Sequence, residues 1–130
     1  MSEDDPTKAD VENELDMARQ ALIDANRGHG AGQSNAAVVN RLYYACFHAA
    51  QAVLYHRGVN PRSHGGVRSL FGSEVVVSGD ATAEQGRFLN ELSQERHRAD
   101  YGSEPVNKDI VELIERSESF VQHMTDLVES

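Results

Sequence analysis

The chain has 130 residues, the length of one domain that can bury its own hydrophobic core. Cys46 is its one cysteine, which excludes an internal disulfide, and no apolar run approaches the roughly 20 residues that cross a bilayer. The N-terminus is acidic and lacks a hydrophobic signal region, so we expect a cytoplasmic protein that forms one domain over residues 1–130, with residues 1–6 as a disordered tail.

The formal net charge is -9, and lysine contributes little of the positive charge. Lys8 and Lys108 are the two lysines, and the other ten basic residues are arginines. An acidic, lysine-poor surface suits a cytoplasm of high salt concentration, so this composition favours a halophilic source over an ordinary acidic protein.

The positive charge gathers in the middle of the chain. Residues 34–72 hold no acidic residue, whereas the segments before and after them are both net negative. The basic residues of this middle segment are Arg41, Arg57, Arg62 and Arg68. They can mark a surface that meets an anion, such as RNA phosphate or an acidic partner. The alternative is that they pair internally with acidic helices.

Apolar residues recur at helical spacing in four long stretches. Glycine, proline and capping residues delimit these stretches. The four helices are expected from Pro6 or Thr7 to Gly28, from Ser34 or Asn35 to Gly58, from Asp80 or Thr82 to Tyr101, and from a cap at Asn107, after Pro105, onward. Long helices with short connections and no strand pattern predict an all-α, up-and-down bundle of four long helices.

One shorter helical segment is expected between the second and third long helices, over residues 63–77. Val67, Leu70 and Phe71 are its apolar anchors. The run Val75–Val77 has the composition of a strand, but a single strand has nothing to pair with, so we expect a helix end or an ordered loop there.

The sequence predicts neither a metal site nor a cofactor. No two of the six histidines have the three- or four-residue spacing of a helical metal site, and the single cysteine has no partner. The glycines of residues 28–32 and 65–66 match no phosphate-binding loop and fit helix ends better.

The densest group of polar side chains lies at the end of the third long helix. It comprises Arg96, His97, Arg98, Asp100 and Tyr101. Residues four apart are neighbours on a helix, so Arg96 can pair with Asp100, and His97 lies beside Tyr101. Composition alone favours a solvated helix end with one ion pair.

The order of motifs along the chain resembles one branch of the HEPN family (higher eukaryotes and prokaryotes nucleotide-binding). The matching segments are Asn40-Arg-Leu-Tyr-Tyr-Ala-Cys-Phe-His-Ala-Ala50, Arg57-Gly58, Ser63-His64-Gly65-Gly66, Leu70-Phe71-Gly72 and Arg96-His-Arg-Ala-Asp-Tyr101. The resemblance extends from about Leu15 to Val121. It implies a bundle of four to five helices that is often a homodimer.

The resemblance also implies a function. Many members of the family are toxin halves of toxin–antitoxin pairs whose partner is a minimal nucleotidyltransferase. Members with activity are metal-independent endoribonucleases, in which an arginine and a histidine from each of two subunits line one cleft.

Carried over by position, Arg96 matches the family's arginine and His97 matches the polar residue beside it. Tyr101 stands where the family's histidine is expected, and a phenol with a pKa near ~10 is a weaker base at neutral pH than an imidazole. The candidate catalytic residues are therefore Arg96, His97 and Tyr101. Candidate contacts to RNA or a nucleotide are Arg98, Asp100 and Arg41.

Three functions follow from these residues. The first is an endoribonuclease toxin in which Arg96 stabilises the scissile phosphate and His97, with Tyr101, handles the proton of the ribose 2′-hydroxyl. The second is a non-catalytic module that binds a nucleotidyltransferase partner, a nucleotide or RNA without cleavage, and the tyrosine at position 101 favours it. The third is a helical dimerisation domain with no ligand. For Tyr43, Tyr44 and His48 we expect packing between helices, with the tyrosine hydroxyls hydrogen-bonded.

Overall fold

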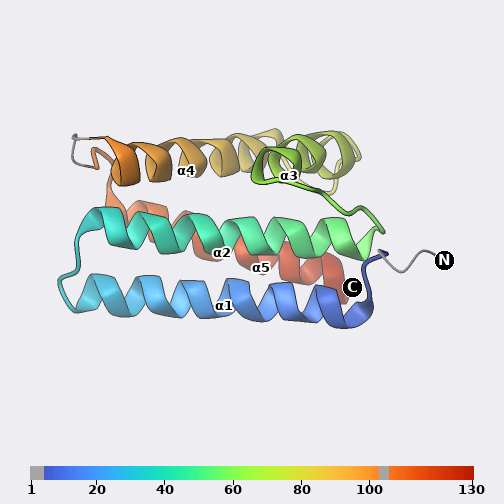
Figure 1. Cartoon of the computed structure of the whole chain (residues 1–130), viewed down its shortest axis with the longest axis horizontal. Helices are drawn as coiled ribbons and strands as arrows, with labels where there is room; N and C mark the ends of the chain where they lie inside the picture. The colour runs from blue at the N-terminus through green and yellow to red at the C-terminus, as the bar shows by residue number, and fades with distance from the viewer. Residues whose placement is uncertain (1–4, 103–105) are drawn as a thin grey trace.

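The computed structural model describes residues 5–102 and 106–130, and within these residues it is helical, with no strand (Figure 1). The long helices are α1 (Lys8–Gly30), α2 (Asn35–His56), α4 (Ala83–Tyr101) and α5 (Ile110–Glu129). The short helix α3 (His64–Leu70) runs directly into a π-helical turn, η1 (Phe71–Val76). The predicted all-α bundle of four long helices and one short helix is confirmed. Most of the predicted N-terminal tail, residues 1–4, lies outside the described residues.

Helix α2 is the centre of the bundle and packs against α1, α4 and α5. Figure 1 shows α1 and α4 on opposite sides of α2, with α5 behind it. Small side chains let the neighbouring backbones approach closely, and those of Ala45, Cys46, Ala49, Ala50 and Ala52 are fully buried. The short elements α3 and η1 also contact α2.

The helix starts follow from local capping chemistry. Thr7 and Thr82 each form a capping box, in which the threonine side chain accepts from a backbone N–H three residues on and the side chain there accepts in return. The Ser34 hydroxyl caps α2 by accepting from the Ala37 N–H at 3.1 Å. Helix α5 differs from the prediction, because Asp109 rather than Asn107 is its cap and accepts from the N–H groups of Val111 and Glu112.

The first helix is longer than predicted and continues through Gly28 to Gly30. Its C-cap is Ala31, and the chain turns at the next residue, Gly32, whose φ of 78° lies in the left-handed region. The Gln33 N–H then donates to the Gly28 carbonyl at 2.9 Å and closes the turn. At Gly28 a side chain would collide with that of Gln33.

The run Val75–Val77 forms no strand, as expected, and most of it belongs to the π-helical turn. Phe71 and Val75 are both fully buried on the core side of this turn, and the Phe71 ring lies 5.6 Å from that of Phe120 in α5. Arg57, just after α2, holds the segment from outside by donating to the Glu74 carbonyl at 2.8 Å and by pairing with Asp80.

The start of α1 and the end of α5 lie at one end of the bundle, and the last turns of α4 lie at the other (Figure 1). In the described parts of the chain, no helix combines the length and apolar character needed to traverse a bilayer.

Candidate functional site

The polar cluster at the end of α4 divides between two faces of the helix. His97 and Tyr101 are on the outer face, with ring centroids 5.0 Å apart, and the Tyr101 side chain is 74% exposed. Arg96 points instead towards α2, and its side chain is 19% exposed. The predicted pairing of neighbours four residues apart is confirmed, but the cluster is more than a solvated helix end.

Arg96 lies on the aromatic surface of α2. Its Cζ is 5.0 Å from the centre of the Tyr43 ring and 5.6 Å from that of the Tyr44 ring, which are cation–π distances. Its Nη1 pairs with Oδ2 of Asp100 at 3.2 Å. The Arg96 Nε is buried and has no hydrogen-bond partner among the described residues. The guanidinium group is therefore fixed in place while part of its donor capacity stays unused.

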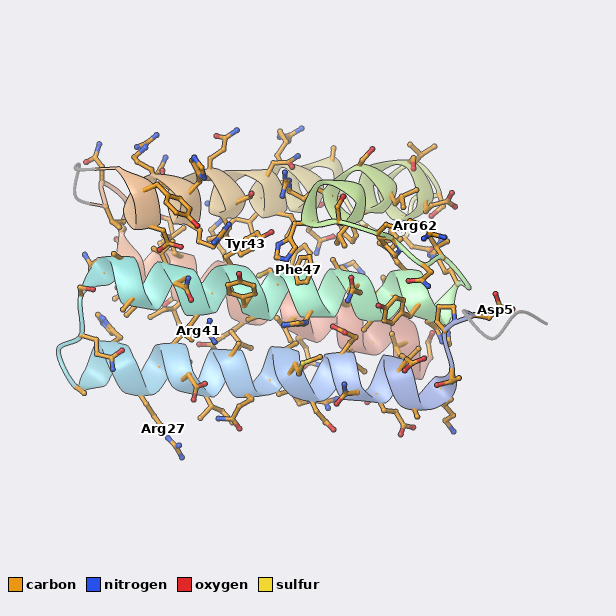
Figure 2. All side chains as sticks on the ribbon, in the orientation of Figure 1. Asp5, Arg27, Arg41, Tyr43, Phe47 and Arg62 are labelled. Atoms are coloured by element: carbon orange, nitrogen blue, oxygen red, sulfur yellow. The ribbon has the colours of Figure 1, made fainter. Side chains whose placement is uncertain are left out.

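Asp100 extends this arrangement to the start of α2. Its Oδ2 also accepts from the Asn40 side-chain amide at 3.3 Å, and the Asn40 oxygen accepts from Arg41 at 2.7 Å. The Arg41 guanidinium lies 5.2 Å from the Tyr44 ring centre, so Tyr44 has two arginine neighbours, Arg41 and Arg96. Figure 2 shows Arg41 between α1 and α2 and Tyr43 between α2 and α4.

His64, the first residue of α3, meets the same aromatic surface from another direction. Its Nδ1 is 3.0 Å from the hydroxyl oxygen of Tyr43, whose side chain is fully buried. Its ring stacks on that of Phe47, with centroids 4.1 Å apart and planes inclined by 19°. Burial lowers the pKa of His64 below the usual value, and the charges of Arg96 and Arg68 lower it further.

An open depression of about 800 Å³ lies between α3 and the end of α4. Its basic side chains are Arg68, Arg96, Arg98, His64 and His97, and no carboxylate of the described residues lines it. Tyr101 forms part of its edge. In a protein of net charge -9, a hollow whose lining includes basic side chains and no carboxylate is suited to an anionic ligand.

The structure gathers four of the six candidate residues in this depression: Arg96, His97, Arg98 and Tyr101. Asp100 supports it from behind by binding Arg96. Arg41 does not line it, and belongs to a separate hollow of about 390 Å³ with Asn40 and Asp100. Nη1 of Arg98 lies 3.6 Å from Oε1 of Glu95, which is a longer distance than the 3.2 Å between Arg96 and Asp100.

Three residues of this site were not among the candidates: His64, Arg68 and Tyr43. His64 lies 32 positions before Arg96 in the chain, so no local spacing connects them. The available signal was the Ser63-His64-Gly65-Gly66 segment of the resemblance. Arg68 belonged to the basic middle segment, in which Arg68 lines the depression and Arg57 pairs internally with Asp80.

A second buried polar group joins α1 to α2 away from the depression. The Glu14 carboxylate meets His48 Nδ1 at 2.6 Å and accepts from the Gln51 amide at 3.0 Å. Glu14 is 7% exposed, so these partners satisfy a carboxylate at a helix interface. His48 therefore contributes to packing between helices.

Comparison with known proteins places this geometry in a family. The model of the HEPN domain matches residues 11–127, which is most of the chain. A protein of Thermotoga maritima named "UPF0332 protein" is 33% identical over 120 residues, which cover 86% of this chain and 86% of the relative. A protein of Methanocaldococcus jannaschii named "Putative toxin" is 34% identical over 87 residues, or 66% of this chain and 65% of the relative.

The match runs from within α1 to within α5 and includes Tyr43, His64 and the Arg96 cluster. The chain is therefore a member of the HEPN domain family.

Proposed function

We propose that this protein is the HEPN component of a toxin–antitoxin-type pair and that it cleaves RNA as a metal-independent endoribonuclease. The observation that carries the proposal is the depression at the end of α4, where Arg96 and four other basic side chains converge without a carboxylate among its lining residues. The name of the M. jannaschii relative supports the toxin assignment.

Arg96 is the residue proposed to contact the scissile phosphate. A guanidinium presents a planar fork of donors that fits phosphate oxygens and keeps its charge at all physiological pH values. Stacking on Tyr43 and Tyr44 and the contact with Asp100 fix the group before substrate arrives. Attack of the ribose 2′-hydroxyl on phosphorus then gives a 2′,3′-cyclic phosphate and a free 5′-hydroxyl.

The partners we propose are a second copy of this chain and a minimal nucleotidyltransferase, as the HEPN family implies. In a homodimer, two depressions facing each other would give one cleft with Arg96, His97 and Tyr101 from both subunits. The openness of the depression and the high exposure of Tyr101 fit a surface that a second subunit completes.

A non-catalytic HEPN module is the second candidate function. It is favoured by the exposed phenol of Tyr101 at the position of the family's histidine. Such a module would bind the nucleotidyltransferase, a nucleotide or RNA through the same basic depression.

Cleavage of labelled RNA by the purified protein tests the proposal, with Arg96→Ala as the decisive variant. Loss of the phosphate contact should slow cleavage by ~10²–10³-fold. Arg96→Lys should also be slow, because an ammonium group cannot reproduce the fork. Arg87→Ala is the matched control, since Arg87 is an exposed arginine on the same helix and should leave the rate unchanged.

The chelator EDTA should leave the rate unchanged if no metal takes part. RNA that stays intact with wild-type protein but is cleaved by Tyr101→His would establish the non-catalytic module. Cleavage by Arg96→Ala at the wild-type rate would contradict the assignment of the activity to this depression.

A further inference from the structure

We propose that His64 is the catalytic base of this site, accepting the proton of the ribose 2′-hydroxyl, and that Tyr43 positions it. The inference rests on the ribonuclease function proposed above. It assigns the base of that reaction to a histidine that lies outside the Arg96–Tyr101 cluster of α4. The observation behind it is that the fold brings His64 of α3 and Arg96 of α4 onto one tyrosine ring of α2.

Tyr43 connects the two groups. Its ring is fully buried, its face lies 5.0 Å from the Arg96 Cζ, and its hydroxyl lies 3.0 Å from His64 Nδ1. A buried side chain in the central helix has little freedom to move, so both groups have a fixed relation to the same support. Both line the depression in which the phosphodiester would lie.

The His64 ring is held in a way that leaves one nitrogen free. Phe47 stacks on its face at 4.1 Å, and the Tyr43 hydroxyl engages Nδ1. Nε2 is therefore the nitrogen left for a ligand in the depression. When Nδ1 carries the hydrogen and donates it to the Tyr43 oxygen, Nε2 has the lone pair that a base requires.

The charges around His64 favour the neutral ring. The groups that face it are His48, Tyr43 and Tyr44 on α2, Arg68 on α3 and Arg96 on α4. None of these is a carboxylate. Burial and these positive neighbours lower the pKa of His64, so the ring is predominantly neutral at pH 7 and can take up a proton.

His97 is the obvious competitor, but its surroundings hold it less firmly. It lies on the exposed face of α4 and its ring neighbour is Tyr101, which is itself 74% exposed. An exposed pair has more freedom than a ring fixed by stacking and a hydrogen bond to a buried group. Precise placement of the base favours His64.

The proposed step balances without any further reactant. Nε2 of His64 takes the proton from the 2′-hydroxyl as its oxygen forms a bond to phosphorus. The bond from phosphorus to the 5′-oxygen breaks, and that oxygen takes a proton from water. His64 then returns its proton to the resulting hydroxide, which leaves a cyclic phosphate and a 5′-hydroxyl.

The test compares His64→Ala with His97→Ala in cleavage of labelled RNA, with Arg96→Ala measured beside them. His64→Ala should lower kcat by ~10²–10⁴-fold, the usual contribution of a general base, and His97→Ala by less than about threefold. Free imidazole added to His64→Ala should restore part of the rate. Because His64 and His97 both lie at the surface of the bundle, both histidine variants should fold, and circular dichroism checks this.

The dependence of the rate on pH separates a base from a structural residue. The wild-type kcat/KM should rise tenfold per pH unit below the His64 pKa and then level off, and this rise should be absent from the residual activity of His64→Ala. Tyr43→Phe should lower kcat by about 2- to 10-fold, as expected for one neutral hydrogen bond. Tyr43→Phe should also move the midpoint of the pH–rate profile to lower pH, because the protonated His64 ring loses the Tyr43 oxygen as a hydrogen-bond acceptor.

Each outcome assigns the failure to one proposal. If Arg96→Ala loses cleavage but His64→Ala keeps it, the ribonuclease function stands and the role of His64 is wrong. If His97→Ala shows the large loss and the imidazole rescue, His97 is the base instead. If wild-type protein leaves RNA intact, the ribonuclease function fails and takes this inference with it.

Discussion

Tyr43 shows how a residue of the hydrophobic core can also build a polar site. Its ring is fully buried in the bundle, while its hydroxyl and its face support His64 and Arg96. The Tyr44 ring meets that of Tyr43 edge-on, with centroids 5.3 Å apart. Because the core is closely packed, Tyr43 has little freedom to move, and it restricts the motion of His64 and Arg96 in the same way.

Cys46 should be unreactive in the native protein. It is fully buried in α2, and burial raises the pKa of its thiol to about 12, so almost no thiolate exists at neutral pH. We expect no reaction with a disulfide reagent such as DTNB until the protein unfolds. A cysteine at the exposed position 122, in the double variant Cys46→Ala and Gln122→Cys, should react at once. Rapid labelling of native wild-type protein would show that the centre of the bundle opens.

The stability of the protein should depend on His64 below neutral pH. Its pKa is lowered by folding, so in acid the unfolded chain binds the proton more tightly than the native protein does. This contribution to stability is complete above the unfolded pKa of ~6.5 and is lost as the pH falls through the lower native value. Melting temperatures at pH 7.5 and 5.5 should therefore differ less for His64→Gln than for wild type. Equal differences would mean that the ring is not held as described.

At the scale of helices, the apolar stripes define the core, and two leucines test it. Leu15 in α1 is 3% exposed and Leu42 in α2 is fully buried. Leu15→Asp or Leu42→Asp would bury a carboxylate without a partner, which costs several kcal/mol from a total stability of ~5–15 kcal/mol. We expect either variant to be largely unfolded by circular dichroism. Ala9→Asp, at an exposed position in the first turn of α1, should melt at or above the wild-type temperature.

Helix starts could be predicted to within one or two residues from local signals. Thr7, Ser34 and Thr82, each one of two starts that the sequence allowed, are the caps, because a hydroxyl followed by free backbone N–H groups makes its own local structure. Where two signals compete, three-dimensional packing decides. Gly28 fits a helix end equally well, but its backbone stays helical and the chain turns at Gly32.

The start of α5 and the π-helical turn show the same limit. Asn107 and Asp109 are both good caps, and the choice depends on where Ile110, which is 7% exposed, meets the core. The turn Phe71–Val76 places Phe71 and Val75 on the core together, a spacing that apolar periodicity alone does not distinguish from an α-helix. Each choice depends on contacts with distant residues.

At the scale of the molecule, the sequence predicted the all-α bundle and the part of the site that lies on α4. The α4 cluster is contiguous in sequence, so Arg96, His97 and Asp100 could be found together. His64 and Arg68 join them only because α3 docks beside α4 on the surface of α2. Helical periodicity relates residues three or four positions apart, and it cannot show that residues about thirty positions apart lie together. Only the structure therefore reveals the complete depression.

We expect the protein to be a homodimer whose interface covers the end of α4. Light scattering at tens of micromolar in high salt should give about twice the monomer mass. Tyr101→Asp should weaken the dimer, because it replaces an exposed aromatic ring of the proposed interface with a charged side chain. Val77→Asp, at a residue 80% exposed and outside the depression, is the matched control and should leave the mass unchanged. A strictly monomeric wild type would contradict the shared cleft.

The positions of the start of α1 and the end of α5 have a practical consequence for tethering the molecule. Both lie at one end of the bundle, and the last turns of α4 lie at the other (Figure 1). A tag, a fluorescent fusion or a surface linker attached before α1 or after α5 would therefore join the bundle at the end away from the last turns of α4. The protein can be immobilised through either attachment for single-molecule or biosensor work, and the tether would leave the depression accessible to RNA or to a second subunit.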